Sequence, residues 1–232
     1  MLSARNQGAL EKLAEELGGA TVVVADLSKA GEPERLAREA GDVDILIANA
    51  GIPATGRLAT FATDELDRAI AVNLRSGMVL AHQLAPAMVE RKSGHMVFMS
   101  SVAGHVAAGG ESVYSATKFG IRGFALALRE ELWGTGVGVS VICPTFVSEA
   151  GMWAVTGLKP DPVAGEVTPA QVSDAVWTAI TKNRAEVDVM RLPLKASLKI
   201  QAITPGLFAS VGRATGAMKP NEALTERQRD KR

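Results

Sequence analysis

The chain has 232 residues and lacks the residue patterns of several protein classes. Its single cysteine, Cys143, excludes a disulfide within the chain and a cysteine cluster that would bind zinc. The three histidines are scattered without metal-ligand spacing, so we predict no metal site (His82, His95 and His105). Aromatic residues are only 4% of the chain, and Tyr114 is the single tyrosine.

The sequence also lacks an excess of either charge and a long apolar run. Lys and Arg together number 25, as do Asp and Glu, which gives no support for nucleic acid as a partner. We find no signal peptide and no apolar run of the roughly 18 residues that a membrane span needs, so we expect no integral membrane segment and a cytoplasmic location. An apolar content of 47% with 23 glycines favours one packed domain over residues 1–232.

Apolar runs alternate with helical patterns along the chain. Predicted strands are Thr21–Ala25, Val43–Ala48, His95–Met99 and Val137–Cys143, and predicted helices are Ala9–Leu17, Pro33–Ala40, Asp64–Lys92 and Glu111–Leu132. This order predicts an α/β fold, a doubly wound parallel sheet with helices on both faces. Ligands bind beyond the carboxyl ends of such strands, so the informative residues should follow the strands.

Tyr114 and Lys118 are four residues apart on one predicted helix, and therefore share a face of it. A phenol has a reference pKa of about 10, and a neighbouring ammonium lowers it by stabilising the anion. The pair is therefore a candidate proton donor. The alternative is a core aromatic residue with an exposed lysine one turn later, which is the commoner meaning of this spacing.

Polar residues follow the predicted strands in a fixed order. The set is Asp26-Leu27, Ala48-Asn49-Ala50-Gly51, Asn73, Ser101, Tyr114 with Lys118, and Pro144. Its order and spacing resemble the short-chain dehydrogenase/reductase (SDR) family, closely from Leu2 to Trp153 and loosely beyond. The resemblance implies a Rossmann-like fold and an NAD(P)-dependent enzyme that moves a hydride between nicotinamide and a carbonyl or secondary alcohol.

The resemblance also implies roles for four catalytic residues. Tyr114 would be the general acid and base, and Lys118 would lower the pKa of Tyr114 and hydrogen-bond the nicotinamide ribose. Ser101, the second serine of the Ser-Ser pair, would orient the substrate oxygen. Asn73 would hold a water linking Lys118 to solvent, with a packing role for its amide as the alternative.

The implied cofactor contacts lie at the strand ends. Asp26 and Leu27 would contact the adenine, Asn49-Ala50-Gly51 would pass close to the cofactor, and Pro144, Thr145 and Val147 would line the nicotinamide, together with Tyr114 and Lys118. Asp26 could instead cap the turn that follows it. Thr145 replaces the glycine usual after this proline. Arg5 stands where an acidic residue would select NAD, so NADP is favoured and NAD remains possible.

The sequence contains no Thr-Gly-x-x-x-Gly-x-Gly loop, with which the family begins. One β-α unit is therefore missing from the pattern, and we expect two unpaired strand edges in the middle of the sheet. Either the true start lies upstream of Met1, or the chain is a truncated remnant. The alternatives to an enzyme are accordingly an inactive remnant and a non-catalytic binding or regulatory module.

The rear of the chain resembles the family less. Residues 148–168 correspond to the substrate flap, and their apolar character favours a lipophilic small-molecule substrate, although a surface loop explains them nearly as well. Thr168-Pro169 should open a helix ending near Lys182, and Val187–Met190 should be the last strand. Leu194–Val211 is predicted as a packed helix or dimer contact, with interfacial membrane contact as the alternative. Residues 225–232 are predicted to be a disordered tail. A homodimer or homotetramer is implied by the resemblance alone.

Overall fold

A computed structural model of the chain describes residues 1–160, 164–216 and 221–232. Its main sheet is parallel, with the strand order β3 (Ile45–Ala48), β4 (Gly94–Met99), β5 (Val137–Pro144) and β8 (Glu186–Val189). β1 (Leu2–Ala4) and β2 (Val22–Val24) form a separate parallel pair, and so do β6 (Phe146–Val147) and β7 (Glu166–Val167). The α/β Rossmann-like fold predicted from the sequence is confirmed, and each predicted strand is present with ends shifted by one or two residues.

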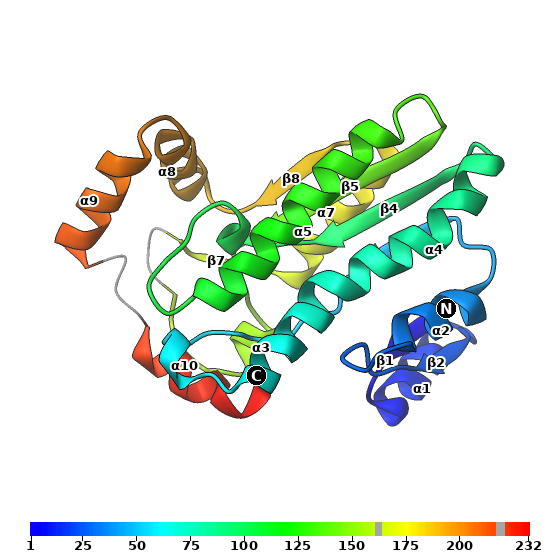
Figure 1. Cartoon of the computed structure of the whole chain (residues 1–232), viewed down its shortest axis with the longest axis horizontal. Helices are drawn as coiled ribbons and strands as arrows, with labels where there is room; N and C mark the ends of the chain where they lie inside the picture. The colour runs from blue at the N-terminus through cyan, green and yellow to red at the C-terminus, as the bar shows by residue number, and fades with distance from the viewer. Residues whose placement is uncertain (161–163, 217–220) are drawn as a thin grey trace.

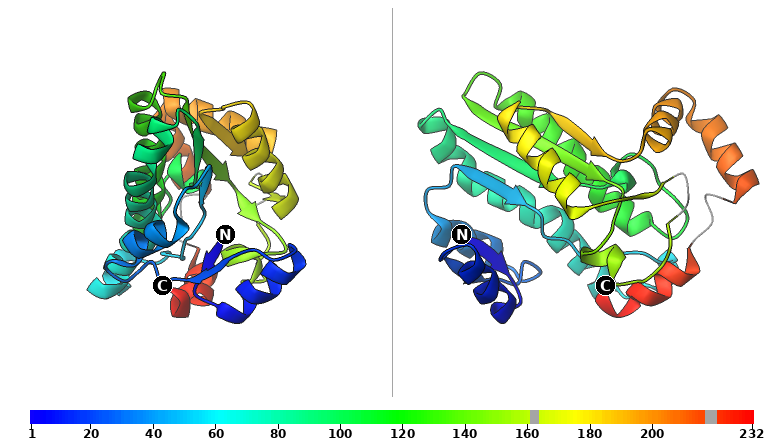
Figure 2. Two further views of the ribbon diagram at one scale, coloured as in Figure 1. Left: turned by 90° about the vertical axis from the view of Figure 1, so that its right-hand side faces the viewer. Right: turned by 180° about the vertical axis from the view of Figure 1, so that it is seen from behind.

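Helices cover both faces of the main sheet (Figures 1 and 2). α4 (Ser76–Glu90) and α5 (Ser112–Glu131) lie on one face and α7 (Pro169–Thr181) on the other. The other described helices are α1 (Gln7–Glu16), α2 (Glu32–Ala40), α3 (Thr63–Ile70), α6 (Gly151–Ala154), α8 (Leu192–Ile203), α9 (Pro205–Thr215) and α10 (Glu222–Gln228). Short 3₁₀ turns occupy Leu58–Thr60, Val102–Gly104 and Arg229–Lys231. The long helix predicted over Asp64–Lys92 is α3 and α4 joined by a π-helical turn, Ala71–Arg75.

The hydrophobic core lies on both faces of the two central strands. Phe98 of β4 and Val141 of β5 are fully buried under α4 and α5, and the Phe98 ring packs edge-on against Phe124 at 5.5 Å between centroids. On the other face Val97 and Ile142 pack against α7. Burial of both faces explains why these strands are continuously apolar rather than alternating.

The β1–β2 pair lies apart from the main sheet (Figures 1 and 2), and no strand in the described part of the chain is hydrogen-bonded to both. Among the described residues, the outer edge of β3 has no strand partner, and Ile45 and Ile47 on it are about half exposed, at 46% and 49%. These are the unpaired edges that the sequence analysis expects. The pair is nevertheless attached to the body, because Val23 and Ala25 belong to the main core cluster.

The C-terminal residues differ from the prediction of a disordered tail over 225–232. They form the end of α10 and a 3₁₀ turn, and they pack against the body. Thr55 donates a 2.8 Å hydrogen bond to Gln228, and the guanidinium of Arg232 lies 4.2 Å from the centre of the Phe61 ring. The charged composition of the segment concealed these contacts, because each depends on a residue more than 150 positions away.

Candidate active site

Ser101, Tyr114 and Lys118 come together at the carboxyl end of β4. Ser101 follows the strand and caps the 3₁₀ turn after it, its hydroxyl accepting a 3.2 Å hydrogen bond from the amide of Ala103. Tyr114 lies in the first turn of α5, and Lys118 follows one turn later with its Nζ 5.6 Å from the centre of the Tyr114 ring. The helical face predicted from the four-residue spacing is therefore present.

The Tyr114 hydroxyl is not acidic in this structure. Burial raises the pKa of Tyr114 to about 12; the hydrogen bond with Ser101 lowers that pKa, and the nearby Glu111 raises it. The sequence predicts that Lys118 lowers this pKa. In the structure the Lys118 ammonium is not a main influence on the pKa of Tyr114. Its Nζ instead donates a hydrogen bond to the carbonyl oxygen of Met99 at 3.0 Å.

Lys118 is only 3% exposed. Burial lowers the pKa of Lys118 to about 8, with the Cys143 thiol acting in the opposite direction. A lysine of this kind is protonated at neutral pH but gives up its proton more readily than an exposed one. Its ammonium is therefore held by a single backbone carbonyl close to the Tyr114 ring.

The two adjacent serines have different surroundings. Ser100 is 2% exposed and donates to the carbonyl oxygen of Lys118 at 2.9 Å, so it fixes the backbone of α5. Ser101 is less buried, and its hydroxyl contacts Tyr114. This difference supports the choice of Ser101 as the functional serine.

Asn73 lies in the π-helical turn, and such turns are frequent at functional sites. Its amide bonds both backbone groups of Ile52, accepting from the nitrogen at 2.7 Å and donating to the oxygen at 2.9 Å. It also reaches Thr117 on α5 at 3.4 Å. The amide therefore ties the segment after β3 to α5, which agrees with the packing role considered in the sequence analysis. The contact with Ile52 had no signal in the sequence.

Most of the predicted cofactor residues line one cavity of about 340 Å³ between β1–β2 and β3. They are Arg5, Asp26, Leu27, Asn49, Ala50 and Gly51, and Asn73, predicted as catalytic, also lines the cavity. Tyr114, Lys118, Pro144, Thr145 and Val147, predicted as cofactor contacts too, are not on its wall. A Cβ on Gly51 would lie 3.5 Å from Asn73 Oδ1 and 3.7 Å from Lys118 Nζ, so the backbone of Gly51 runs beside two of the candidate catalytic groups.

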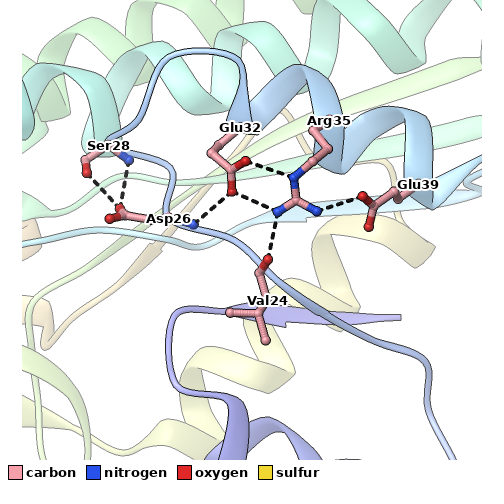
Figure 3. Close-up of polar contacts among 6 residues, drawn as sticks. All are labelled: Val24, Asp26, Ser28, Glu32, Arg35 and Glu39. Atoms are coloured by element: carbon pink, nitrogen blue, oxygen red, sulfur yellow. Dashed lines mark hydrogen bonds and ion pairs between the residues drawn. The ribbon is translucent and has the colours of Figure 1, made fainter.

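The loop that carries Asp26 is held by its own polar contacts (Figure 3). One carboxylate oxygen of Asp26 accepts hydrogen bonds from the hydroxyl and the amide of Ser28, at 2.7 and 3.1 Å. The hydroxyl bond is the main reason that the pKa of Asp26 lies below its usual value. Behind it, Glu32 pairs with Arg35 and accepts from the Asp26 amide. Asp26 therefore does cap its turn.

The residues predicted at the nicotinamide end follow β5. Pro144 ends the strand, Thr145 is buried and Val147 belongs to β6. The Thr145 amide donates to the carbonyl of Val189 at 3.0 Å, while its buried hydroxyl has no hydrogen-bond partner in the structure. Thr145 is not among the residues with positive φ, so replacing the usual glycine causes no strain there.

The segment predicted as the flap, 148–168, is ordered where it is described; its residues 161–163 lie outside the described residues. The Trp153 indole donates to Glu166 at 2.6 Å and stacks on Phe146, so Trp153 is buried. Met152 reaches the site, its Cε lying 3.7 Å from the Cβ position of Gly51. Gln228 donates to the Met152 carbonyl at 2.9 Å, a contact that sequence reasoning missed.

His105, Cys143 and Glu186 place ligand-type atoms within 4.8 Å of one another behind the site. Arg122 already pairs with the Glu186 carboxylate, through contacts of 2.5 and 3.3 Å, and His105 bonds Asp188 at 3.0 Å. Burial raises the pKa of the Cys143 thiol to about 12. A cation would have to displace Arg122 and a thiol proton, so we assign no metal to this cluster.

The fold is a Rossmann-like α/β fold, and Ser101, Tyr114 and Lys118 form the candidate active site at the carboxyl end of β4. The family model for short chain dehydrogenases matches residues 1–161. The chain belongs to this family, and the oxidoreductase class expected from the sequence is confirmed.

Individual relatives agree with this assignment. The chain is 35% identical over 218 residues to the ketoacyl reductase HetN of Nostoc sp., covering 90% of this chain and 76% of the relative. It resembles a serine dehydrogenase complexed with NADP⁺, at a TM-score of 0.71 and 28% identity over 82% of this chain and 84% of the other. A short-chain dehydrogenase from Sphingobium yanoikuyae in complex with NADPH gives a TM-score of 0.72 and 26% identity, over 81% and 76%. Among the described residues, no helix is long and apolar enough to cross a membrane.

Proposed function

We propose that the protein is an NADP(H)-dependent oxidoreductase that interconverts a lipophilic carbonyl compound and its secondary alcohol. The observation that carries this proposal is the placement of Ser101 next to Tyr114, with the buried ammonium of Lys118 beside the ring.

In the proposed reduction, bound NADPH supplies a hydride to the carbonyl carbon. Tyr114 gives its hydroxyl proton to the carbonyl oxygen, and Ser101 donates a hydrogen bond to the same oxygen and orients it. Lys118 stabilises the phenolate left behind, which requires its Nζ to turn from the Met99 carbonyl. In the oxidation of an alcohol, Tyr114 takes the proton in reverse.

The cavity of about 340 Å³ is the proposed cofactor site. Arg5 lies on its wall, where a guanidinium can pair with the 2′-phosphate of NADP, and Asp26 and Leu27 line the same wall for the adenine. Gly51 leads to Lys118 at the nicotinamide end, where Pro144, Thr145 and Val147 are the proposed contacts. The unpartnered Thr145 hydroxyl is a suitable donor or acceptor for the carboxamide. This sequence lacks the glycine-rich loop with which the family binds the pyrophosphate of the cofactor. We therefore expect it to bind NADPH weakly. NAD is the second candidate cofactor.

The flap supplies the support for a lipophilic substrate, through its apolar side chains Met152 and Val155. They lie with Gly51 and Ile52 on the wall of a second cavity of about 490 Å³, which also carries the charged residues Arg5, Arg68, Asp230, Lys231 and Arg232. The similar protein HetN is named a ketoacyl reductase, whose substrates are carbonyl compounds. We propose the same substrate class for this chain.

The proposal is tested by consumption of NADPH with a panel of apolar ketones. We expect turnover at about 1 mM NADPH, a concentration chosen at the upper end of ordinary KM values. Tyr114→Phe should lower kcat by about 10³-fold or more while leaving NADPH binding within about twofold, because it removes only the proton donor. Trp177→Phe, an aromatic change at a residue 69% exposed on α7, serves as the control. Equal turnover by Tyr114→Phe and the wild type would refute the assignment, and cofactor binding without turnover by the wild type would favour the binding module.

We also propose a cytoplasmic homodimer or homotetramer formed through α4 and α5. Met78 on α4 and Phe119 on α5 are 39% and 42% exposed, so both apolar side chains are available for a contact between subunits. Light scattering after gel filtration tests this state, and a monomer at high protein concentration would refute it.

A further inference from the structure

Helices α8 and α9 extend from the body of the molecule (Figure 1). One face of α8 packs against the rest of the molecule. Leu198 is buried, Gln201 donates to the His105 carbonyl at 3.4 Å, and Lys195 lies 3.7 Å from the Asp188 carboxylate. α8 is therefore anchored through one face, and its other face is left without a partner in the described part of the chain.

The opposite side of this helix pair is apolar and exposed. On α8, Leu192, Ile200 and Ile203 are 81%, 57% and 82% exposed, at spacings of eight and three residues that place them on one face. On α9, Leu207 and Val211, four residues apart, are 63% and 53% exposed. We call these five side chains the α8–α9 apolar surface.

The same segment has a strong charge bias. Residues 191–216 contain four basic side chains (Arg191, Lys195, Lys199 and Arg213) and no Asp or Glu. The whole chain is balanced, with 25 residues of each sign. Exposed apolar side chains combined with basic ones are the composition of helices that lie in the interface of a membrane with anionic lipids.

We propose that the α8–α9 apolar surface docks on the anionic phospholipid surface of a bilayer. Neither helix spans the bilayer, because they contain 12 and 11 residues and are separated at Thr204-Pro205. The exposed basic side chains Lys199 and Arg213 attract the lipid headgroups, while the α8–α9 apolar surface enters the outer edge of the acyl region. Lys195 remains paired with Asp188 on the side that faces the body. A second copy of the chain is a poorer occupant, since it would bring the same positive charges together.

The docking helices and the proposed site share one edge of the sheet. α8 follows β8 at the carboxyl edge, the edge that also presents Ser101. In so far as the protein acts on lipophilic carbonyl compounds, which rests on the proposed function, docking would bring this edge of the sheet toward the phase in which such substrates dissolve. Membrane binding itself needs no cofactor and no turnover.

The test is sedimentation of the 232-residue protein with vesicles of phosphatidylcholine, with and without phosphatidylglycerol. We expect binding to the vesicles that contain phosphatidylglycerol and little binding to pure phosphatidylcholine. Raising the salt to about 1 M, where the Debye length falls to about 3 Å, should weaken the binding. Absence of wild-type binding to the anionic vesicles would overturn the proposal.

Two double variants separate the apolar and the charged contributions. Ile200→Ser/Ile203→Ser and Lys199→Glu/Arg213→Glu should each weaken vesicle binding by about tenfold or more. Leu17→Ser, at a residue 62% exposed that caps the C-terminus of the distant helix α1, is the matched control and should bind like the wild type. Circular dichroism checks the folding of every variant.

Three outcomes would contradict the lipid surface as the occupant. The first is an equal loss for Leu17→Ser and the Ile double variant. The second is binding that does not depend on Lys199 and Arg213. The third is a dimer, seen by light scattering, that Ile200→Ser/Ile203→Ser dissociates while vesicles bind neither protein; this would assign the surface to a second copy. NADPH titration is scored separately, so a failure of the proposed enzyme would not be mistaken for a failure of docking.

Discussion

The region that handles the proton and the region proposed to hold the nucleotide are built differently. Ser101, Tyr114 and Lys118 stand on β4 and α5, which pack around fully buried side chains such as Phe98 and Val141. Arg5 and Asp26 follow the three-residue strands β1 and β2, which pair only with each other. Val24 in this pair is 40% exposed.

This difference indicates that the candidate catalytic groups and the proposed cofactor contacts have separate structural support. Ser101, Tyr114 and Lys118 are fixed by central strands and buried hydrogen bonds. The proposed nucleotide contacts Arg5 and Asp26 depend on how a small β-α-β unit packs against α2 and on the core residue Val23. If this difference holds, substitutions in the core under Ser101, Tyr114 and Lys118 should lower the free energy of unfolding more than substitutions in the β1–β2 region.

The largest expected effect is in the core beneath the proton-handling groups. Phe98→Ala should lower the free energy of unfolding by about 4 kcal/mol, because it leaves a large cavity between β4 and α5. Val141→Ala in β5 and Val23→Ala in β2 make the same smaller deletion in the two regions. We expect Val23→Ala to lower the free energy of unfolding by less than Val141→Ala. Urea unfolding measures these losses. Hydrogen exchange should show the β2 amides opening at lower free energy than those of β5; equal protection would mean that the two sheets form one cooperative unit.

The second effect is the pH dependence caused by Lys118. Burial lowers the pKa of Lys118 from 10.5 to about 8, so between these pH values the unfolded chain binds more protons at this group than the folded one. The free energy of unfolding should therefore rise by about 3 kcal/mol from this group as the pH increases from 8 to 10.5. Lys118→Met should lack this contribution, and urea titrations of both proteins give the difference. Parallel pH profiles would show that Lys118 is solvated.

The third effect tests the link between the regions. Asn73→Ala should cost about 2 kcal/mol, because it leaves both backbone groups of Ile52 without a partner in a buried setting. Asn6→Ala, which removes only the exposed cap of α1, should cost about 1 kcal/mol. Thermal or urea unfolding measures both. If Asn73→Ala cost no more than Asn6→Ala, the Ile52 segment would not depend on the amide.

The smallest effect concerns cofactor choice. Arg5→Ala should weaken NADPH binding by about tenfold, which is about 1.4 kcal/mol, and leave NADH binding unchanged. Lys12→Ala, an exposed cation on α1, is the control. Fluorescence titration with both dinucleotides measures the ratio. Equal losses for NADPH and NADH would remove Arg5 from phosphate recognition.

The order of strands and helices could be predicted from the sequence, because buried strands and amphipathic helices have different periods. The same holds for the Tyr114–Lys118 face and for the strand-end positions of Asp26, Asn49 and Ser101. The C-terminal fold could not be predicted this way. Thr55 and Gln228 meet only after the whole chain has folded, and a charged segment gives no local sign of such a partner.

The sequence by itself determined which chemical groups the protein has at its strand ends, since local periodicity fixes where strands stop. Only the tertiary structure decided what those groups contact. It turned the Asn73 amide onto Ile52, directed Lys118 to the Met99 carbonyl and left the α8–α9 apolar surface exposed. Burial and hydrogen-bond partners depend on contacts between distant parts of the chain, and these set the pKa values on which the proposed chemistry depends.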